Sequence, residues 1–176
     1  MIINRDFVVG ICVSIIFMLG GTSICVAQQG DQILDGIGET GLISRYIFAG
    51  DLKDWSRNGL HASHPTKAKF ERDQRFGQVL SLSGKSDDFV TLPDNALSDM
   101  ESLSISTWLF LRSDKPNQRL FDFGKDASTH FYVAPAGTDK QKYLQAAITT
   151  KTHPSTGTLS PVLATGKWVH VAVVID

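Results

Sequence analysis

Short apolar runs alternate with turn-forming residues along most of this chain. Runs of this length, rich in β-branched and aromatic residues, are typical of β-strands. The separators are turn sequences such as Asn58-Gly59 and Pro93-Asp94. The pattern predicts strands at Leu42–Phe48, Val79–Leu82, Phe89–Leu92, Leu103–Leu111, Arg119–Phe123, His130–Ala134, Tyr143–Thr149 and Trp168–Ile175.

Two of these strands carry the clearest patterns. Leu103–Leu111 alternates strictly, with one aliphatic face and a second face that turns aromatic at Trp108 and Phe110. Trp168–Ile175 is apolar on both faces, which predicts burial on each side and a place in the core for His170. We expect Trp108 and Trp168 to be packed as well. Since helical periodicity is limited to a possible turn at Asn95–Met100, the sequence predicts an all-β sandwich or barrel.

The N-terminus has the layout of a signal peptide. A short polar start precedes an apolar run at Phe7–Leu19, and Cys25 and Ala27 suit a cut before Gln28. Residues 1–27 are therefore predicted to be removed on export, giving a secreted, periplasmic or cell-surface bacterial protein. The alternatives are a membrane anchor or a buried helix, but the run is shorter than the roughly 20 residues that a span needs. Residues 28–40, rich in Gly and Asp, are predicted to be a linker.

Composition narrows the classes of function. The chain is 42% hydrophobic and 20% charged with a net charge of -1, as in ordinary globular proteins. Because the chain has no basic cluster, we expect no nucleic-acid partner. Because cleavage would remove the N-terminal apolar run, we expect no membrane span in the cleaved protein. Residues 41–176 are predicted to form one module. The chain stops at Asp176, directly after an apolar strand, so we expect the module to lack its last strands and to be the front part of a longer protein.

Four stretches in order resemble a known family. They are Gly41–Phe48 with Asp54–His61, Leu80–Gly84 with Asp88–Pro93, Leu103–Leu109, and Gly166–Ala172. Together they resemble the laminin-G-like, concanavalin A-like jelly-roll modules that are common in exported bacterial glycoside hydrolases. The resemblance implies an antiparallel jelly-roll sandwich over residues 41–176. It also implies a carbohydrate-binding or accessory module, with a glycan or polysaccharide and a downstream catalytic domain of the same chain as partners.

Catalysis by the module itself is not expected. The enzymes of this fold carry Glu-x-Asp-x-x-Glu on one strand, whereas this chain has Glu71 and Asp73 but Phe76 in the third position. We therefore assign no catalytic residue. Two alternatives stay open: a protein-interaction or adhesion module of a cell-surface protein, and a glycan hydrolase in its own right.

Binding residues can be named for two ligands. A sugar ring presents a flat C–H face that stacks on exposed aromatic rings, and Trp55, Tyr132 and Tyr143 are the aromatic residues that the strand patterns do not require in the core. The resemblance also implies one structural calcium ion, held in the loop after the first strand by Asp51, Asp54 and Asn58. This chain has Ala49 where the family usually has an acid, so an Asp/Asn-rich turn is the alternative. A zinc site is not expected, because His61 and His64 lack a third ligand nearby.

Overall fold

The computed structural model describes residues 3–4, 7–15, 41–94, 96–97, 100–126, 128–138, 142–152 and 156–176; for the first two ranges and residue 125 it describes the backbone only. Every regular element within these residues is a β-strand, and none is a helix able to cross a membrane. The strands are β1 (Ile3–Asn4), β2 (Phe7–Ile15), β3 (Lys69–Asp73), β4 (Gly77–Leu82), β5 (Phe89–Val90), β6 (Leu103–Leu111), β7 (Phe121–Asp126), β8 (Thr129–Ala134), β9 (Tyr143–Thr149), β10 (Thr156–Pro161) and β11 (Trp168–Ile175).

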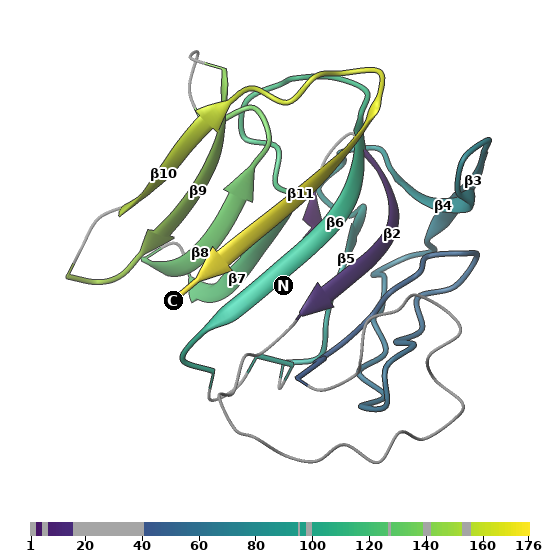
Figure 1. The fold of residues 1–176 in the computed structure, drawn as a ribbon, viewed down its shortest axis with the longest axis horizontal. Helices are drawn as coiled ribbons and strands as arrows, with labels where there is room; N and C mark the ends of the chain where they lie inside the picture. The colour runs from purple at the N-terminus through teal and green to yellow at the C-terminus, as the bar shows by residue number, and fades with distance from the viewer. Residues whose placement is uncertain are drawn as a thin grey trace, which may run out of the picture.

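The strands form two main antiparallel sheets with a shared core (Figure 1). One sheet has the order β11-β6-β2-β4-β3 and the other the order β10-β9-β8-β7, while β1 pairs only with β5. The core between the sheets joins Leu80, Leu109 and Leu111 of the five-stranded sheet to Phe121 and Val133 of the four-stranded sheet. The predicted all-β, antiparallel architecture is confirmed.

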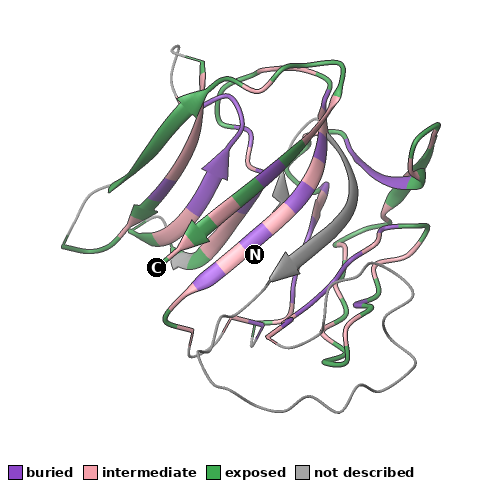
Figure 2. Cartoon of the chain, in the orientation of Figure 1, coloured by how far each residue is buried: buried purple, intermediate pink, exposed green. Residues whose placement is uncertain are grey.

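Strand β6 shows how the sequence pattern becomes a face of the sheet. Burial alternates along all nine of its residues, with aliphatic side chains such as Leu109 buried and Trp108 and Phe110 half-buried on the opposite face (Figure 2). The predicted alternation is confirmed. Trp108 is packed, as expected, but it packs against Phe76 on the outer face, because the core positions are taken by the aliphatic residues on the opposite face of the strand.

Strand β11 differs from its prediction. It lies at the end of the five-stranded sheet, beside β6 alone, and Val171 is its only residue in the buried class. Its other face points away from the core, so His170 is exposed and the side chain of Val174 is 70% exposed. Burial on both sides was therefore a wrong prediction, since among the described residues no second layer covers this outer face (Figure 2).

Four strands were not predicted, namely β1 and β2 within the predicted signal peptide and β3 and β10 further along, and one predicted strand is reduced to an isolated bridge. Strand β3 is mostly charged and exposed, and β10 is exposed at every position, so neither carries an apolar alternation. Within Leu42–Phe48, Tyr46 forms an isolated bridge with Asp54. The predicted turn at Asn95–Met100 lies partly outside the described residues.

The N-terminal apolar run contributes a central strand. Residues Phe7–Ile15 form β2, between β4 and β6, with Val9 opposite both Leu80 and Leu109. Residues 16–40 lie outside the described ranges. Cleavage before Gln28 and the linker at residues 28–40 therefore stay predictions.

Candidate functional site

Four aromatic side chains gather on the outer face of the five-stranded sheet. Trp108 and Phe110 come from β6, Trp168 from β11, and Phe76 from the turn between β3 and β4. Antiparallel register places Trp168 opposite Phe110 and His170 opposite Trp108, so these side chains share one face. We call Phe76, Trp108, Phe110 and Trp168 the outer aromatic cluster.

Trp168 contacts Phe76 and Phe110 edge to face, and Phe76 packs against Trp108 at a tilted angle of 48°. The Phe76 centroid lies 4.8 Å from that of Trp168 and 5.6 Å from that of Trp108. Phe110 and Trp168 are 5.6 Å apart, with an interplanar angle of 65°. All four side chains are half-buried, so part of each ring faces solvent. Such a surface can stack against the apolar C–H face of a sugar ring.

Asp73 fastens the β3–β4 turn to the cluster. Its Oδ1 accepts hydrogen bonds from the backbone N–H groups of Arg75 (2.8 Å) and Phe76 (3.0 Å), and its Oδ2 accepts one from Trp168 Nε1 (3.0 Å). Burial raises the pKa of Asp73, but these donors, with the charge of Arg75, outweigh it and hold the pKa below its ordinary value. The bond to Trp168 spans 95 residues of sequence and fixes where Phe76 meets β11.

Arg75 lies on top of the cluster. Its guanidinium carbon is 4.4 Å from the Trp108 ring centroid and 5.0 Å from that of Phe76, within cation–π range. The neighbouring acid on β3, Glu71, pairs with Arg112 and accepts a hydrogen bond from Ser81 Oγ at 2.7 Å. Both Glu71 and Asp73 thus serve as hydrogen-bond acceptors that hold this hairpin.

The residues predicted to stack on sugar lie elsewhere. Trp55 is 48% exposed on a loop that its N–H ties to the carbonyl of Arg45 (2.7 Å). Tyr132 and Tyr143 share the outer face of the four-stranded sheet, but the Tyr132 side chain is buried beneath the guanidinium of Arg119, 4.1 Å from the ring. Tyr132 has its ring contact with His130, on the four-stranded sheet and away from the outer aromatic cluster.

The predicted calcium ligands do not fit a calcium site. The Asp54 carboxylate is buried and accepts four hydrogen bonds, from Arg45 N, Ser56 N, Ser56 Oγ and Leu60 N, at 2.7–2.9 Å. Asn58 turns its amide nitrogen, a donor, toward two backbone carbonyls, and Asp51 accepts from Lys53 N. Calcium needs six to eight oxygens with free lone pairs. The described residues contain no group of three acids, histidines or cysteines placed to hold a metal.

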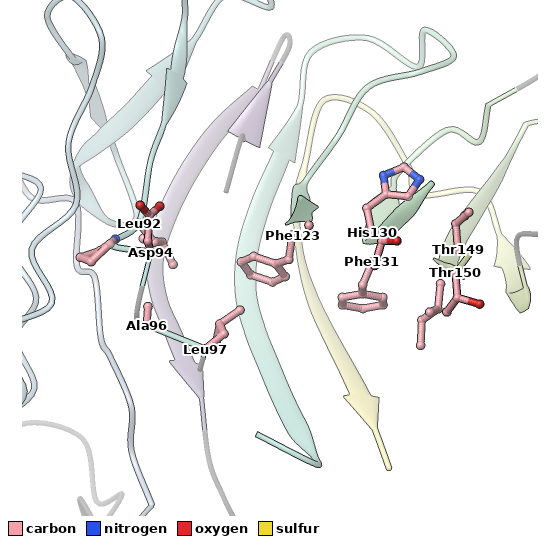
Figure 3. Close-up of a pocket in the computed structure, with 13 residues that line it drawn as sticks. Leu92, Asp94, Ala96, Leu97, Phe123, His130, Phe131, Thr149 and Thr150 are labelled. Carbon is pink, nitrogen blue, oxygen red and sulfur yellow. The ribbon is translucent and has the colours of Figure 1, made fainter. Parts of the chain in front are cut away.

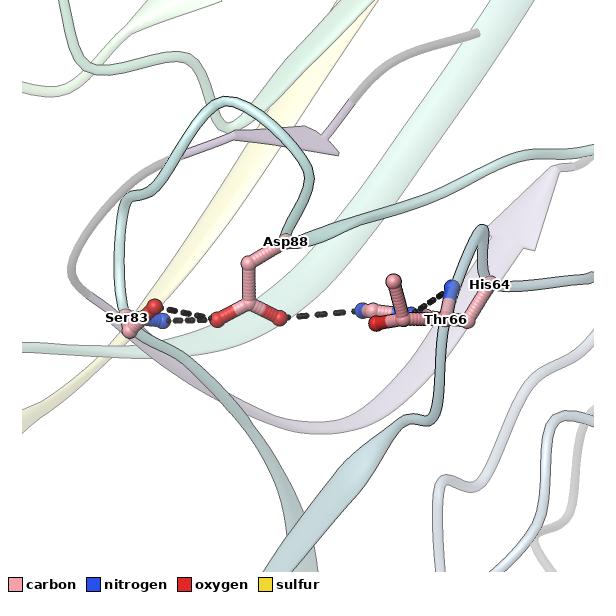
Figure 4. Close-up of polar contacts among 4 residues, drawn as sticks. All are labelled: His64, Thr66, Ser83 and Asp88. Carbon is pink, nitrogen blue, oxygen red and sulfur yellow. Dashed lines mark hydrogen bonds and ion pairs between the residues drawn. The ribbon is translucent and has the colours of Figure 1, made fainter.

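A second polar centre joins His64, Asp88 and Ser83 (Figure 4). The His64 ring accepts a hydrogen bond from Thr66 N at Nδ1, so its proton is on Nε2, which donates to Asp88 Oδ1 at 2.9 Å. Ser83 donates to Asp88 Oδ2 through its N–H (2.6 Å) and its hydroxyl (2.5 Å). A catalytic triad needs the serine hydroxyl to face the imidazole. Here it faces the carboxylate, so the arrangement ties the loop that carries His64 to the β4–β5 loop that carries Ser83 and Asp88.

A cavity lies between the four-stranded sheet and the segment Leu92–Leu97 (Figure 3). It has a volume of about 730 Å³ and a mainly apolar lining, in which Phe123, Phe131 and Ile148 of the four-stranded sheet face Leu92 and Leu97. Because it forms between three strands and a distant turn, no sequence pattern marked it.

Comparison with known proteins gives one match. Residues 83–176, more than half of the chain, match the sequence profile of the laminin G family described as the concanavalin A-like lectin/glucanases superfamily. The matched region includes β6 and β11 with all their aromatic residues. It begins after the β3–β4 turn, so Arg75 and Phe76 lie outside it. No curated protein and no solved structure matches the chain.

Proposed function

Because this chain belongs to the concanavalin A-like lectin/glucanase superfamily, we propose that it is a carbohydrate-binding module and that the outer aromatic cluster is its sugar-binding surface. Lectins and glucanases both handle carbohydrate, so membership supports a carbohydrate-binding or adhesion module in general. The outer aromatic cluster supports this choice of sugar-binding surface, because its four half-buried rings lie on one sheet face and Asp73 bonds to Trp168 within it.

Binding without hydrolysis is the form of this function that the geometry supports best. A glycoside hydrolase needs a free acid and a second carboxylate on either side of one bond. The two acids beside the cluster, Glu71 and Asp73, are engaged with Arg112, Ser81, Trp168 and the turn. We further propose that the module is exported and serves a larger polysaccharide-degrading glycoside hydrolase, with a catalytic domain elsewhere in that protein.

Native affinity electrophoresis of the full chain through gels containing plant polysaccharides tests the proposal. Phe110→Ala removes one ring of the cluster without removing a hydrogen bond, and Trp55→Ala removes an exposed ring from a different loop. An aromatic contact is worth about 0.5–1.5 kcal/mol, so Phe110→Ala is expected to weaken retardation by about two- to tenfold. Trp55→Ala serves as the matched control. Retardation that depends on Trp55 and not on Phe110 would show that sugar binds at the Trp55 loop and not at the outer aromatic cluster. No retardation by any glycan would refute the proposal.

One observation favours the adhesion alternative. Leu159 on β10 and Val174 on β11 are 60% and 70% exposed, and both belong to strands at the ends of their sheets. Exposed apolar residues on such strands are common at protein interfaces. A protein partner whose binding is lost on Val174→Lys, and is unaffected by competing sugars, would support this second function.

A further inference from the structure

Arg75 occupies a special position on the outer aromatic cluster. Its backbone is held by Asp73, but its side chain is exposed and reaches back over Trp108 and Phe76. A guanidinium that lies on an aromatic ring covers the ring face that a sugar would use. A neutral glycan that stacks on Trp108 must therefore displace Arg75 and lose the cation–π contact.

Arg75 forms no close ion pair with another described residue, although its charge acts on Asp73 at longer range. The nearest acids on the same hairpin are used by other donors, since Asp73 accepts from Trp168 and the turn and Glu71 pairs with Arg112. A stacked guanidinium keeps its N–H groups in the plane of the group, pointing outward. That edge matches the two oxygens of a carboxylate.

We propose that Arg75 makes this surface select glycans that carry carboxylates, such as chains of hexuronic acid, over neutral glycans. An acidic chain can stack on the open parts of Phe110 and Trp168 while its carboxylate binds the guanidinium edge, so Arg75 stays in place. A neutral chain gains no such bond and competes with Arg75 for Trp108. This inference rests on the proposed carbohydrate-binding function.

The test compares two forms of one polysaccharide. Polygalacturonate and its fully methyl-esterified form share a backbone and differ in charge, so affinity electrophoresis of the full chain on both isolates the carboxylate. The wild type should be retarded more by the acidic form. Arg75→Gln should weaken binding of the acidic form by about tenfold, as expected for a lost charge-assisted bond, and strengthen binding of the ester by about two- to fivefold. Arg72→Gln, on the same strand hairpin and also exposed, is the matched control.

A second readout needs no glycan. In a Trp55→Phe background, acrylamide should quench tryptophan fluorescence more strongly after Arg75→Gln, because Trp108 loses its cover, and Arg72→Gln should leave quenching unchanged. Unchanged quenching in Arg75→Gln would refute the cover over Trp108. Equal effects of Arg75→Gln on the acidic and esterified polymers would refute the selectivity. If quenching rises but neither polymer nor any neutral glycan is retained, the proposed function fails and the selectivity with it.

Discussion

Asp54, expected from the sequence as a calcium ligand, is the residue whose replacement tests the structure most sharply. Its buried carboxylate accepts from Arg45 N (2.9 Å), Ser56 N (2.8 Å), Ser56 Oγ (2.7 Å) and Leu60 N (2.9 Å). Three of these donors are backbone groups: Ser56 N and Leu60 N belong to the same loop as Asp54, and Arg45 N belongs to the segment of the core residue Tyr46, which pairs with Asp54. Asp54→Ala removes the acceptor from all four at once.

The cost follows from the number of donors left without a partner. A buried donor that loses its partner costs about 1–3 kcal/mol, and water entering the small space left by the carboxylate recovers part of this. We therefore expect Asp54→Ala to lower the free energy of unfolding by about 3–5 kcal/mol, a large fraction of the roughly 5–15 kcal/mol typical of a domain. Asp51→Ala removes one exposed bond to Lys53 N (3.1 Å) and should cost less than about 0.5 kcal/mol.

Urea unfolding of the full chain, followed by tryptophan fluorescence, measures both values. The pKa of Asp54 also sets a pH dependence: burial raises it, but the hydrogen bonds from Arg45, Ser56 and Leu60 outweigh burial and hold it below its ordinary value. Its contribution is therefore present above the unfolded pKa of about 3.9 and is lost as pH falls through the lower folded value. A loss below about 1 kcal/mol for Asp54→Ala, or recovery of stability by calcium in the wild type alone, would refute the structural role.

Three further predictions concern the same architecture. Burial raises the pKa of Asp88, but its bonds from Ser83 and His64 outweigh burial and lower the pKa below its ordinary value. Stability should therefore fall as pH drops below about 4. Urea unfolding repeated across pH should show a smaller fall in Asp88→Asn. Trp168→Phe keeps a ring but loses the donor to Asp73, and should cost about 1–2 kcal/mol in the same unfolding assay; an unchanged midpoint would contradict that bond. Gly124→Ala would press its new methyl group into the backbone of β8, and should lower Tm by more than about 5 °C in differential scanning calorimetry. A smaller shift would show that β7 and β8 can separate locally.

The fold was predictable where one face of a strand is buried. In Leu103–Leu111 every second side chain faces the other sheet and is buried, so apolar residues recur at every second position of the sequence. Strands β3 and β10 were not predictable in this way, because exposed strands at the ends of sheets carry no apolar period. Their register depends on backbone pairing with β4 and β9, which leaves no mark on side-chain composition.

The outer aromatic cluster was missed for a related reason. The sequence shows that its strand residues are aromatic, but an aromatic residue in a strand can lie on either face of the sheet. In β6, the aliphatic residues at the alternate positions take the core face, so the aromatic residues lie on the outer face. Phe76 reaches the cluster through contacts far apart in sequence, namely its ring contacts with Trp108 and Trp168 and the bond between Asp73 and Trp168. Asp73 two residues before Arg75 and four before Gly77 is a local turn signal that could have suggested the hairpin, though not its partner. Asp54 shows the converse limit: the sequence reveals its carboxylate oxygens but not the backbone and hydroxyl donors that bond to them in the fold.

Strand β2 lies within the segment that the sequence predicts to be an export signal. The apolar run Phe7–Ile15 that is predicted to direct secretion is the same segment that completes the middle of the five-stranded sheet. A chain that folded in this way before reaching the membrane would hide its own targeting signal between β4 and β6. Efficient secretion would then require that the segment be captured before the sheet closes, and the cleaved protein would emerge with a gap in that sheet, open to another strand. Translocation and folding would therefore compete for one stretch of chain, so the rate at which β4 and β6 come together would decide how much protein leaves the cell.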